Sequence, residues 1–378
     1  MNWPTKQVSQ LCLLAVDCVN KTAPRVEYET PYKMIRTTNV KGGFIYLDDV
    51  GYVTEDVFEK WTRRSKPKFG DVILTREAPV GEVGRFTSTD ESIFLGQRLF
   101  HYRPNPDLLD WNFLAYALQS HEVQGRLRAM GFGATVEHIK VGDAENLLIP
   151  CPPVDIQRKI GEILANYDDL IENNRRRMTL LEQSARLLYE EWFVRLRFPG
   201  HEHTRIVDGV PEGWERKKLG QCITLKYGKA LKAEDRVAGD YPVYGSSGIV
   251  GSHDKPLVKG PAIILGRKGN VGSVYWSSKS FYPIDTVYFV EAESSSIYLY
   301  YALKNMHFIS TDVAVPGLNR DFAYSRMLLQ PTTAIHRAFL EAVAPVHAQL
   351  ETLDELNQKL RATRDLLLPR LMSGELVA

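Results

Sequence analysis

Two stretches of the chain carry apolar residues at alternating steps of four and three positions, which is the spacing of a coiled-coil seam. Each position of the second stretch lies 179 residues after its counterpart in the first, so the pattern predicts two equivalent long helices. The seam positions are Ile160, Leu164, Tyr167, Ile171, Asn174, Met178, Leu181, Ala185, Leu188 and Trp192, and then Phe339, Val343, Val346, Leu350, Leu353, Asn357, Leu360, Arg364, Leu367 and Leu371.

A helix with a single apolar stripe cannot bury that stripe alone. We therefore expect the two helices to pack on each other as an antiparallel coiled coil, which would give the chain pseudo-two-fold symmetry. Each seam contains one asparagine, which either fixes the register or lies at a frayed or hydrated position; the spacing favours neither. Arg364 also departs from an apolar seam and predicts looser packing there.

The segment before each helix also repeats. LTREAPVGEV from Leu74 matches LGRKGNVGSV from Leu265 at five of ten positions, with Arg76 matching Arg267. Both segments follow a β-rich run and contain glycine, so each predicts a strand, a turn and a second strand. Prolines at 153 and 331 mark the starts of the helices, because proline disfavours helix before itself and permits it afterwards.

These patterns predict an α+β protein with two mixed α/β domains in tandem, separated by two long helices. The expected boundaries are 1–153 for the first domain, 154–197 for the first helix, 198–209 for a linker, 210–332 for the second domain and 333–378 for the second helix.

Composition adds few constraints. The net charge is +1; residues 1–152 hold 18 Lys and Arg against 19 Asp and Glu, whereas residues 210–332 hold 15 against 11. The second domain is therefore mildly basic and the first is not, which is weak evidence for a nucleic-acid partner. No apolar run approaches the length of a membrane span, and the four cysteines are scattered, so we expect a cytoplasmic protein without a metal site.

Catalytic motifs are not evident. The nearest approach to the [ND]-P-P-[YF] turn of amino-methyltransferases is the run from Cys151 to Val154, which lacks the polar acceptor and the aromatic ring. The chain contains neither a G-x-x-x-x-G-K-[ST] phosphate loop nor a G-x-S-x-G elbow, although a Ser/His/Asp arrangement made in the fold stays open. We expect no catalytic activity from this chain alone.

Several segments, in their order along the chain, resemble the specificity (S) subunit of type I restriction–modification systems. In the second half these are PEGWERKKLG from Pro211, YPVYGSSGIVG from Tyr241, LGRKGNVGSV from Leu265 and VPGLNRD from Val315. In the first half they are GDVILTREAPVG from Gly70 and LGQRLFHYRP from Leu95, and the helix ends are EEWFVRLRFPG from Glu190 and LLLPRLMSGEL from Leu366. The first half departs from the family in lacking a W-x-x-x-x-L-G opening and a YGSSG-like segment.

The resemblance implies that each domain is a target recognition domain that reads one half of a bipartite double-stranded DNA sequence. It also implies that the helices set the gap and dock two methyltransferase subunits, which bind S-adenosylmethionine. Restriction and translocase subunits would bring ATP and magnesium. Two alternatives stay open: a coiled-coil protein-interaction scaffold without DNA binding, and a subunit of a methylation-only complex.

On this interpretation, DNA contacts are expected from basic and small polar residues outside the helices. Arg76 and Arg267, being matched, indicate either shared phosphate anchoring or a shared structural salt bridge, and they are poor candidates for base reading. The candidates are Arg63, Arg64, Lys66, Lys68 and Arg76 in the first domain, and Lys226, Lys229, Lys232, Tyr244, Ser246, Ser247, Arg267 and Lys268 in the second.

Overall fold

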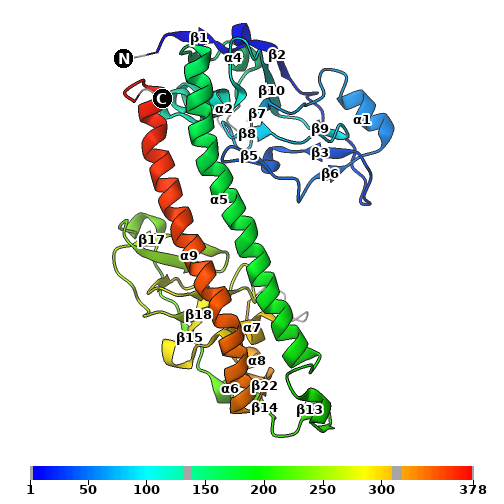
Figure 1. Ribbon diagram of the computed structural model, residues 1–378, viewed down its shortest axis with the longest axis vertical. Helices are drawn as coiled ribbons and strands as arrows, with labels where there is room; N and C mark the ends of the chain where they lie inside the picture. The colour runs from blue at the N-terminus through cyan, green and yellow to red at the C-terminus, as the bar shows by residue number, and fades with distance from the viewer. Residues whose placement is uncertain (1–2, 132–137, 309–316, 377–378) are drawn as a thin grey trace. The chain divides into compact units, whose positions relative to one another are not determined.

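The computed structural model describes residues 3–131, 138–308 and 317–376 (Figure 1). It divides into two compact units, residues 1–173 with 356–378 (unit 1) and residues 174–355 (unit 2). The two predicted long helices are present as α5 (Val154–Tyr189), which is continued by a π-helical turn (Glu190–Val194), and α9 (Thr333–Met372). Because each helix contributes to both units, this division differs from the boundaries expected from the sequence.

Unit 1 is built on an antiparallel four-stranded sheet in the order β2-β10-β7-β8. A three-stranded sheet, β6-β3-β9, has one antiparallel and one parallel pair. The strands are β1 (Thr5–Gln7), β2 (Cys12–Asp17), β3 (Lys33–Ile35), β4 (Val40–Lys41), β5 (Phe44–Ile45), β6 (Gly51–Tyr52), β7 (Asp71–Thr75), β8 (Val83–Phe86), β9 (Ile93–Leu95), β10 (Leu99–Pro104) and β11 (Leu148–Pro150). The short helices are η1 (Val8–Leu11), η2 (Thr37–Asn39), α1 (Glu55–Trp61), α2 (Trp111–Gln119), α3 (His121–Met130) and α4 (Val141–Glu145).

Unit 2 has the same strand arrangement. Its four-stranded sheet has the order β15-β21-β18-β19, and its three-stranded sheet, β17-β16-β20, again has one antiparallel and one parallel pair. The strands are β12 (Ile206–Val207), β13 (Val210–Pro211), β14 (Glu215–Lys218), β15 (Lys226–Tyr227), β16 (Tyr241–Gly245), β17 (Gly248–His253), β18 (Ala262–Gly266), β19 (Val274–Ser277), β20 (Tyr282–Pro283), β21 (Val287–Val290) and β22 (Met327–Gln330). The short helices are η4 (His201–His203), α6 (Leu219–Cys222), η5 (Ala233–Asp235), η6 (Ala292–Ser294), α7 (Ile297–Lys304) and α8 (Arg320–Tyr324).

The predicted strand–turn–strand repeats are β7–β8 and β18–β19. In each turn a glycine with positive φ, 86° at Gly81 and 79° at Gly272, donates its N–H to the carbonyl at the end of the preceding strand at 2.9 Å. A residue with a side chain rarely adopts this φ, so the glycine match reflects the geometry of the turn. The sequence repeat is therefore a repeat of structure.

The structure also supplies the opening that the first half lacked as a motif. Trp3 stands five residues before Val8, as Trp214 stands five residues before Leu219. The N–H of Val8 bonds the carbonyl of Leu147 at 2.9 Å, and the N–H of Leu219 bonds that of Arg326 at 2.8 Å, so both openings pair with the strand before a long helix. The pattern W-x-x-x-x-L-G does not match the first half, because valine and serine occupy its last two positions there.

The predicted linker, 198–209, is not structureless. It contains η4 and strand β12, which pairs with β13, and its first residue Phe198 is buried against Trp214 with ring centroids 4.6 Å apart. Gly200 and Gly209, with φ of 85° and 70°, form turns in this segment.

The seam positions on α5 and α9 are all buried or half-buried. In unit 1 the segments of the two helices lie side by side and run in opposite directions (Figure 1), and Ile160, Leu164 and Leu371 belong to one core. In unit 2, Tyr189 and Phe339 pack at 6.0 Å in the corresponding core. Asn174 and Asn357 are 5% and 1% exposed, which contradicts the hydrated alternative for both.

The prediction of loose packing at Arg364 was wrong. Its guanidinium forms an ion pair with Asp168, whose side chain is 1% exposed, and the Tyr116 hydroxyl donates to the same carboxylate at 2.6 Å. The polar seam position therefore joins α9, α5 and α2 within unit 1.

Replacing Arg364 with alanine should destabilise unit 1, because it leaves the buried Asp168 carboxylate without its cationic partner. We expect the free energy of unfolding to fall by about 2–3 kcal/mol. This loss is smaller than for a fully buried pair, because the Arg364 side chain keeps 23% exposure. Urea unfolding of the full chain measures the change. Arg370→Ala on the same helix breaks an exposed pair with Glu375 and should cost under about 1 kcal/mol. Equal losses of unfolding free energy for the two variants would contradict the assignment of Arg364 as the stabilising partner of Asp168.

Candidate nucleic-acid interface

Five segments of the second domain meet at one end of its sheets, and together they form the second loop cluster: 226–229, 245–248, 267–270, 284–286 and 317–320. The N–H groups of Arg267 and Lys268 both bond the carbonyl of Thr286, at 2.9 and 3.1 Å. The N–H of Leu318 bonds the carbonyl of Arg267 at 2.8 Å, and the Asn270 N–H donates to the Ser246 hydroxyl at 3.4 Å. Hydrogen bonds thus link the segments 245–248, 267–270, 284–286 and 317–320, and the N–H of Lys229 bonds the carbonyl of Pro283 beside them at 3.0 Å.

The first domain has a matching first loop cluster: 16–18, 36–38, 76–79, 96–98 and 138–139. The N–H of Arg76 bonds the carbonyl of Arg98 at 2.8 Å, and the N–H of Ile139 bonds the carbonyl of Arg76 at 3.0 Å. These bonds reproduce those of Arg267 with Thr286 and Leu318. By the same register, Arg36-Thr37-Thr38 takes the place of Gly245-Ser246-Ser247.

Sequence comparison missed the segment 36–38, because glycine and serine are replaced by arginine and threonine. The Thr37 hydroxyl nevertheless donates to the carbonyl of Ala78 across the cluster at 2.9 Å, and Thr38 is exposed. The parallel pairing of β3 with β9 is the signal that identifies the segment. Thr38 joins Ser247 as a small polar side chain at the surface.

In the first domain, the matched arginine Arg76 has a structural role. Arg76 is 6% exposed, and its guanidinium lies 3.8 Å from the Asp17 carboxylate. Arg267 is half-buried and donates from Nε and Nη2 to the carbonyl of Asp285 at 3.2 and 2.6 Å. Each arginine therefore braces its own loop cluster, whereas the neighbouring Lys268 is exposed.

The basic residues Arg63, Arg64, Lys66 and Lys68 are exposed and lie in the segment 62–70, between α1 and β7. The ammonium of Lys66 lies 4.9 Å from the Phe58 ring centroid, and Arg64 pairs with Asp17.

A buried polar network fastens the segment 62–70 to the sheet. His101, which is 0% exposed, contacts the Ser65 hydroxyl at 2.9 Å and the Asp71 carboxylate at 2.6 Å. Arg103 and the Lys68 N–H also donate to Asp71, at 2.8 and 2.6 Å. The Ser/His/Asp arrangement left open by the sequence is thus present. Its imidazole, however, is fully buried, and its carboxylate already accepts hydrogen bonds from several donors. We assign it the positioning of the basic segment.

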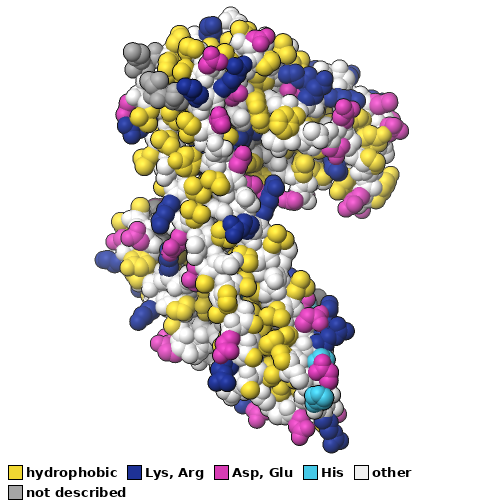
Figure 2. All heavy atoms as spheres, in the orientation of Figure 1, with side chains coloured by type: hydrophobic (Ala, Val, Ile, Leu, Met, Phe, Trp, Pro, Cys, Tyr) yellow, Lys and Arg dark blue, Asp and Glu magenta, His cyan; other side chains and the backbone are white. Residues whose placement is uncertain are grey.

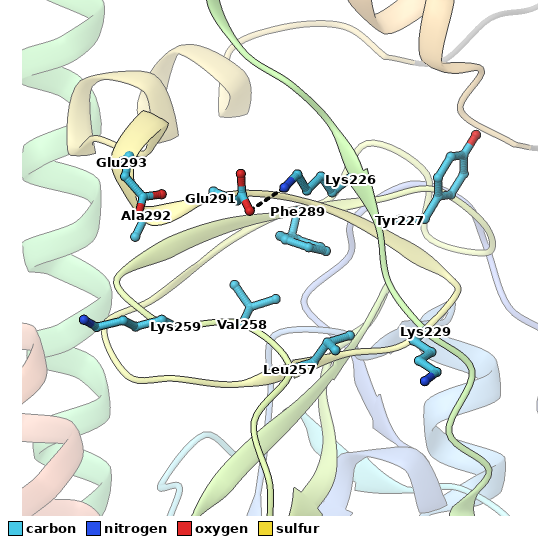
Figure 3. Close-up of a pocket in the computed structure, with 10 residues that line it drawn as sticks. All are labelled: Lys226, Tyr227, Lys229, Leu257, Val258, Lys259, Phe289, Glu291, Ala292 and Glu293. Carbon is cyan, nitrogen blue, oxygen red and sulfur yellow. Dashed lines mark hydrogen bonds and ion pairs between the residues drawn. The ribbon is translucent and has the colours of Figure 1, made fainter.

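Three lysines predicted as contacts lie on the surface of the second domain. Lys226 pairs with Glu291, Lys232 lies 3.4 Å from Glu234, and Lys229 is exposed. Lys226 and Lys229 also line a pocket of about 420 Å³ (Figure 3). In that view Val258 and Phe289 face each other across it, and Glu291 and Glu293 lie to one side.

Tyr244 and Ser246 are less accessible than expected. Tyr244 is 7% exposed and packs edge-on against Phe281 at 5.4 Å, and Ser246 is 9% exposed and bonded within the cluster. We therefore withdraw Tyr244 as a DNA contact and keep the exposed Ser247. An aromatic residue in a strand is more often a core residue than a surface one, and this residue follows that rule.

Charge is mixed on the face of the molecule drawn in Figure 2. Figure 2 shows basic and acidic side chains interspersed on the face drawn, without one large field of a single sign. In the described residues no cluster of three or more His, Cys, Asp or Glu could hold a metal ion. Among the same residues, no helix has the length and apolar character that a membrane crossing needs.

Two copies of one mixed α/β fold, each followed by a long helix, define a duplicated protein with a loop cluster in each copy. The model of the family described as type I restriction modification DNA specificity domain matches residues 2–183 and 211–321. These matches cover more than half of the chain, and the chain belongs to this family.

Individual relatives agree with this assignment. The type I restriction enzyme MjaIX specificity subunit of Methanocaldococcus jannaschii is 27% identical over 180 residues, which are 47% of this chain and 40% of the relative. The HindI specificity subunit of Haemophilus influenzae is 22% identical over an alignment of 401 positions, covering 82% of this chain and 87% of the relative. The chain spans about half the length of the first curated relatives it matches, or less.

A solved S subunit of a type I restriction-modification system from M. genitalium has the same fold. Its TM-score is 0.57 at 21% sequence identity, and the match covers 98% of this chain and 96% of that one.

The Asp71 network predicts a pH dependence of stability. Burial alone would raise the pKa of Asp71, but hydrogen bonds from His101 and Arg103 outweigh it and lower the pKa below the ordinary 3.8. The stability that Asp71 contributes is therefore fully present above its unfolded-state pKa and is lost as the pH falls through its lower folded-state pKa. In urea unfolding followed from about pH 5 to about pH 2, Asp71→Asn should lose less stability than the wild type. The exposed Asp107→Asn is the control. Parallel plots of unfolding free energy against pH for the wild type and Asp71→Asn would contradict this stabilising role of Asp71.

Proposed function

We propose that this chain is the DNA-sequence-reading specificity subunit of a type I restriction–modification enzyme, and that each domain reads one half of a bipartite target. One observation carries the proposal: the two domains share a strand order and the backbone bonds around their matched arginines but differ in the side chains that their loop clusters expose. Two readers of different half-sequences need this combination, because the scaffold sets how a domain docks while loop side chains meet base edges.

The two long helices would serve as the spacer between the readers. At 1.5 Å per residue, the 36 residues of α5 extend about 54 Å. We propose that α5 and α9 form one antiparallel coiled coil with pseudo-two-fold symmetry along their whole length. The buried, opposed seams within each unit support this arrangement. A rigid spacer of constant length would set the gap between half-sites.

The outer faces of the helices would dock the partner subunits. In unit 1, Leu170 and Leu366 are 51% and 70% exposed, and in unit 2, Leu180 and Leu187 are 64% and 56% exposed. Apolar side chains gather along both helices on the face drawn in Figure 2. Exposed leucines on a long helix favour a protein partner. We propose two methyltransferase subunits here.

The chemistry would belong to the partners. The methyltransferase subunits would bring S-adenosylmethionine, and restriction and translocase subunits would bring ATP and magnesium. The sealed Ser65–His101–Asp71 network supports a non-catalytic role for this chain, because no substrate could reach its imidazole. A methylation-only complex differs from this proposal in its partners alone, and a scaffold without DNA binding leaves the two loop clusters unexplained.

Duplex binding tests the proposal directly. The full chain, co-expressed with its methyltransferase, should shift a pool of random duplexes in a gel at low salt, where phosphate contacts are strongest, and release them as salt rises. Repeated selection from the shifted band should enrich two short sequences separated by a constant gap. If no duplex binds in any salt, with or without the methyltransferase, the chain is a protein scaffold and the proposal fails.

A further inference from the structure

One position in the repeat differs in chemistry between the two loop clusters. Asp17 ends β2, where it pairs with Phe100, and Tyr227 ends β15, where it pairs with Tyr288 in the same register. Each side chain contacts the matched arginine of its own domain. Each also contacts a second arginine, which comes from a different part of the chain in the two domains.

In the first domain the position is a carboxylate. Asp17 lies 3.8 Å from the Arg76 guanidinium and forms an ion pair with Arg64, whose guanidinium also donates to the carbonyl of Cys18 at 3.2 Å. The Asp17 carboxylate therefore neutralises one of the two positive charges. Both guanidiniums also direct N–H groups at acceptors within the protein.

In the second domain the position is an aromatic ring. The guanidinium carbons of Arg267 and Arg320 lie 5.2 and 5.4 Å from the Tyr227 ring centroid, within cation–π distance. Tyr227 is 51% exposed and points away from the other side chains labelled in Figure 3. A neutral ring attracts both cations but cancels neither charge. Within the described ranges, no carboxylate forms an ion pair with either arginine.

The two arginines are held differently. Arg267 donates two hydrogen bonds to the carbonyl of Asp285 and is half-buried. Arg320 is exposed at the first position of α8, and its guanidinium also lies 6.0 Å from the Tyr324 ring. A guanidinium that stacks on a ring by its face keeps its in-plane N–H groups for another acceptor, and phosphate oxygens match that geometry.

We propose that Arg320, steered by Tyr227, grips a phosphate of the half-site under the second domain, and that the first domain has no such grip at the matched position. This inference rests on the proposed DNA-reading function and deepens it. Arg320 is the contacting residue, Tyr227 is a positioning residue, and Arg267 is the second guanidinium in contact with the ring. The more basic composition of residues 210–332 agrees with an unequal grip on the two half-sites.

The salt dependence of duplex binding tests the inference. The full chain with its methyltransferase is titrated on the selected duplex from about 50 to about 200 mM salt, and each phosphate contact contributes about 0.9 to the slope of log affinity against log salt. Arg320→Gln should lower the slope by about one contact, so its affinity should fall about three- to fourfold less than that of the wild type over this range. Arg337→Gln, an exposed cation on α9, is the matched control and should keep the wild-type slope.

Variants of Tyr227 separate positioning from folding. Tyr227→Phe keeps the ring and should bind with the wild-type slope. Tyr227→Asp introduces the arrangement of the first domain, so it should bind more weakly at low salt and show the Arg320→Gln slope. A wild-type slope for Arg320→Gln, or equal behaviour of the two Tyr227 variants, overturns the inference while the DNA-reading function stands. Failure of the wild-type chain to bind any duplex overturns both.

Discussion

The apolar stripe along each long helix is the constraint on which the rest of the structure depends. A helix of 36 or 40 residues with one apolar face is not stable in water unless another surface covers that face. In each unit the cover comes from the other long helix and from the adjacent α/β domain, so the domain core and the helix seam are one hydrophobic cluster. The orientation of each domain on its helices is consequently fixed by packing.

Polar groups where each domain meets the long helices fix its orientation more specifically. In unit 1, Asp168 joins Arg364 of α9 to Tyr116 of α2. In unit 2, Glu182 of α5 pairs with Lys304 and accepts a hydrogen bond from Tyr300, both on α7. Burial would raise the pKa of Glu182, but Lys304 and Tyr300 outweigh it and lower the pKa. These ion pairs, one with a buried carboxylate and one partly exposed, bind each domain to its helices in one geometry, which a reader held at a set distance would need.

Under the proposed function, the duplication also separates the shared scaffold from the side chains that would read DNA. Where the backbone must turn, as at Gly81 and Gly272, or where a loop must be braced, as at Arg76 and Arg267, the residue type is repeated. At other matched positions the two domains diverge, as between Asp17 and Tyr227.

Much of the fold could be predicted from the sequence, because heptad spacing and turn glycines are local and periodic. Both long helices and both strand–turn–strand repeats follow from such patterns. The opening at Trp3 and the segment 36–38 could not be predicted, since backbone pairing defines them and tolerates many side chains. Tyr244, Arg76 and Arg320 show the limit for the site: exposure and stacking partners depend on residues far away in the chain, which no local motif records.

The methylated DNA motif in cells that carry this chain and its methyltransferase is the most direct measurement of the proposed function. For the wild type we expect a split motif with a constant gap. Deleting one heptad from each helix, residues 175–181 and 349–355, shortens the spacer by about 10 Å at 1.5 Å per residue. At 3.4 Å per base pair the gap should shrink by about three base pairs, with both half-sites unchanged. A contiguous motif, or a gap that survives the deletion, would contradict the account.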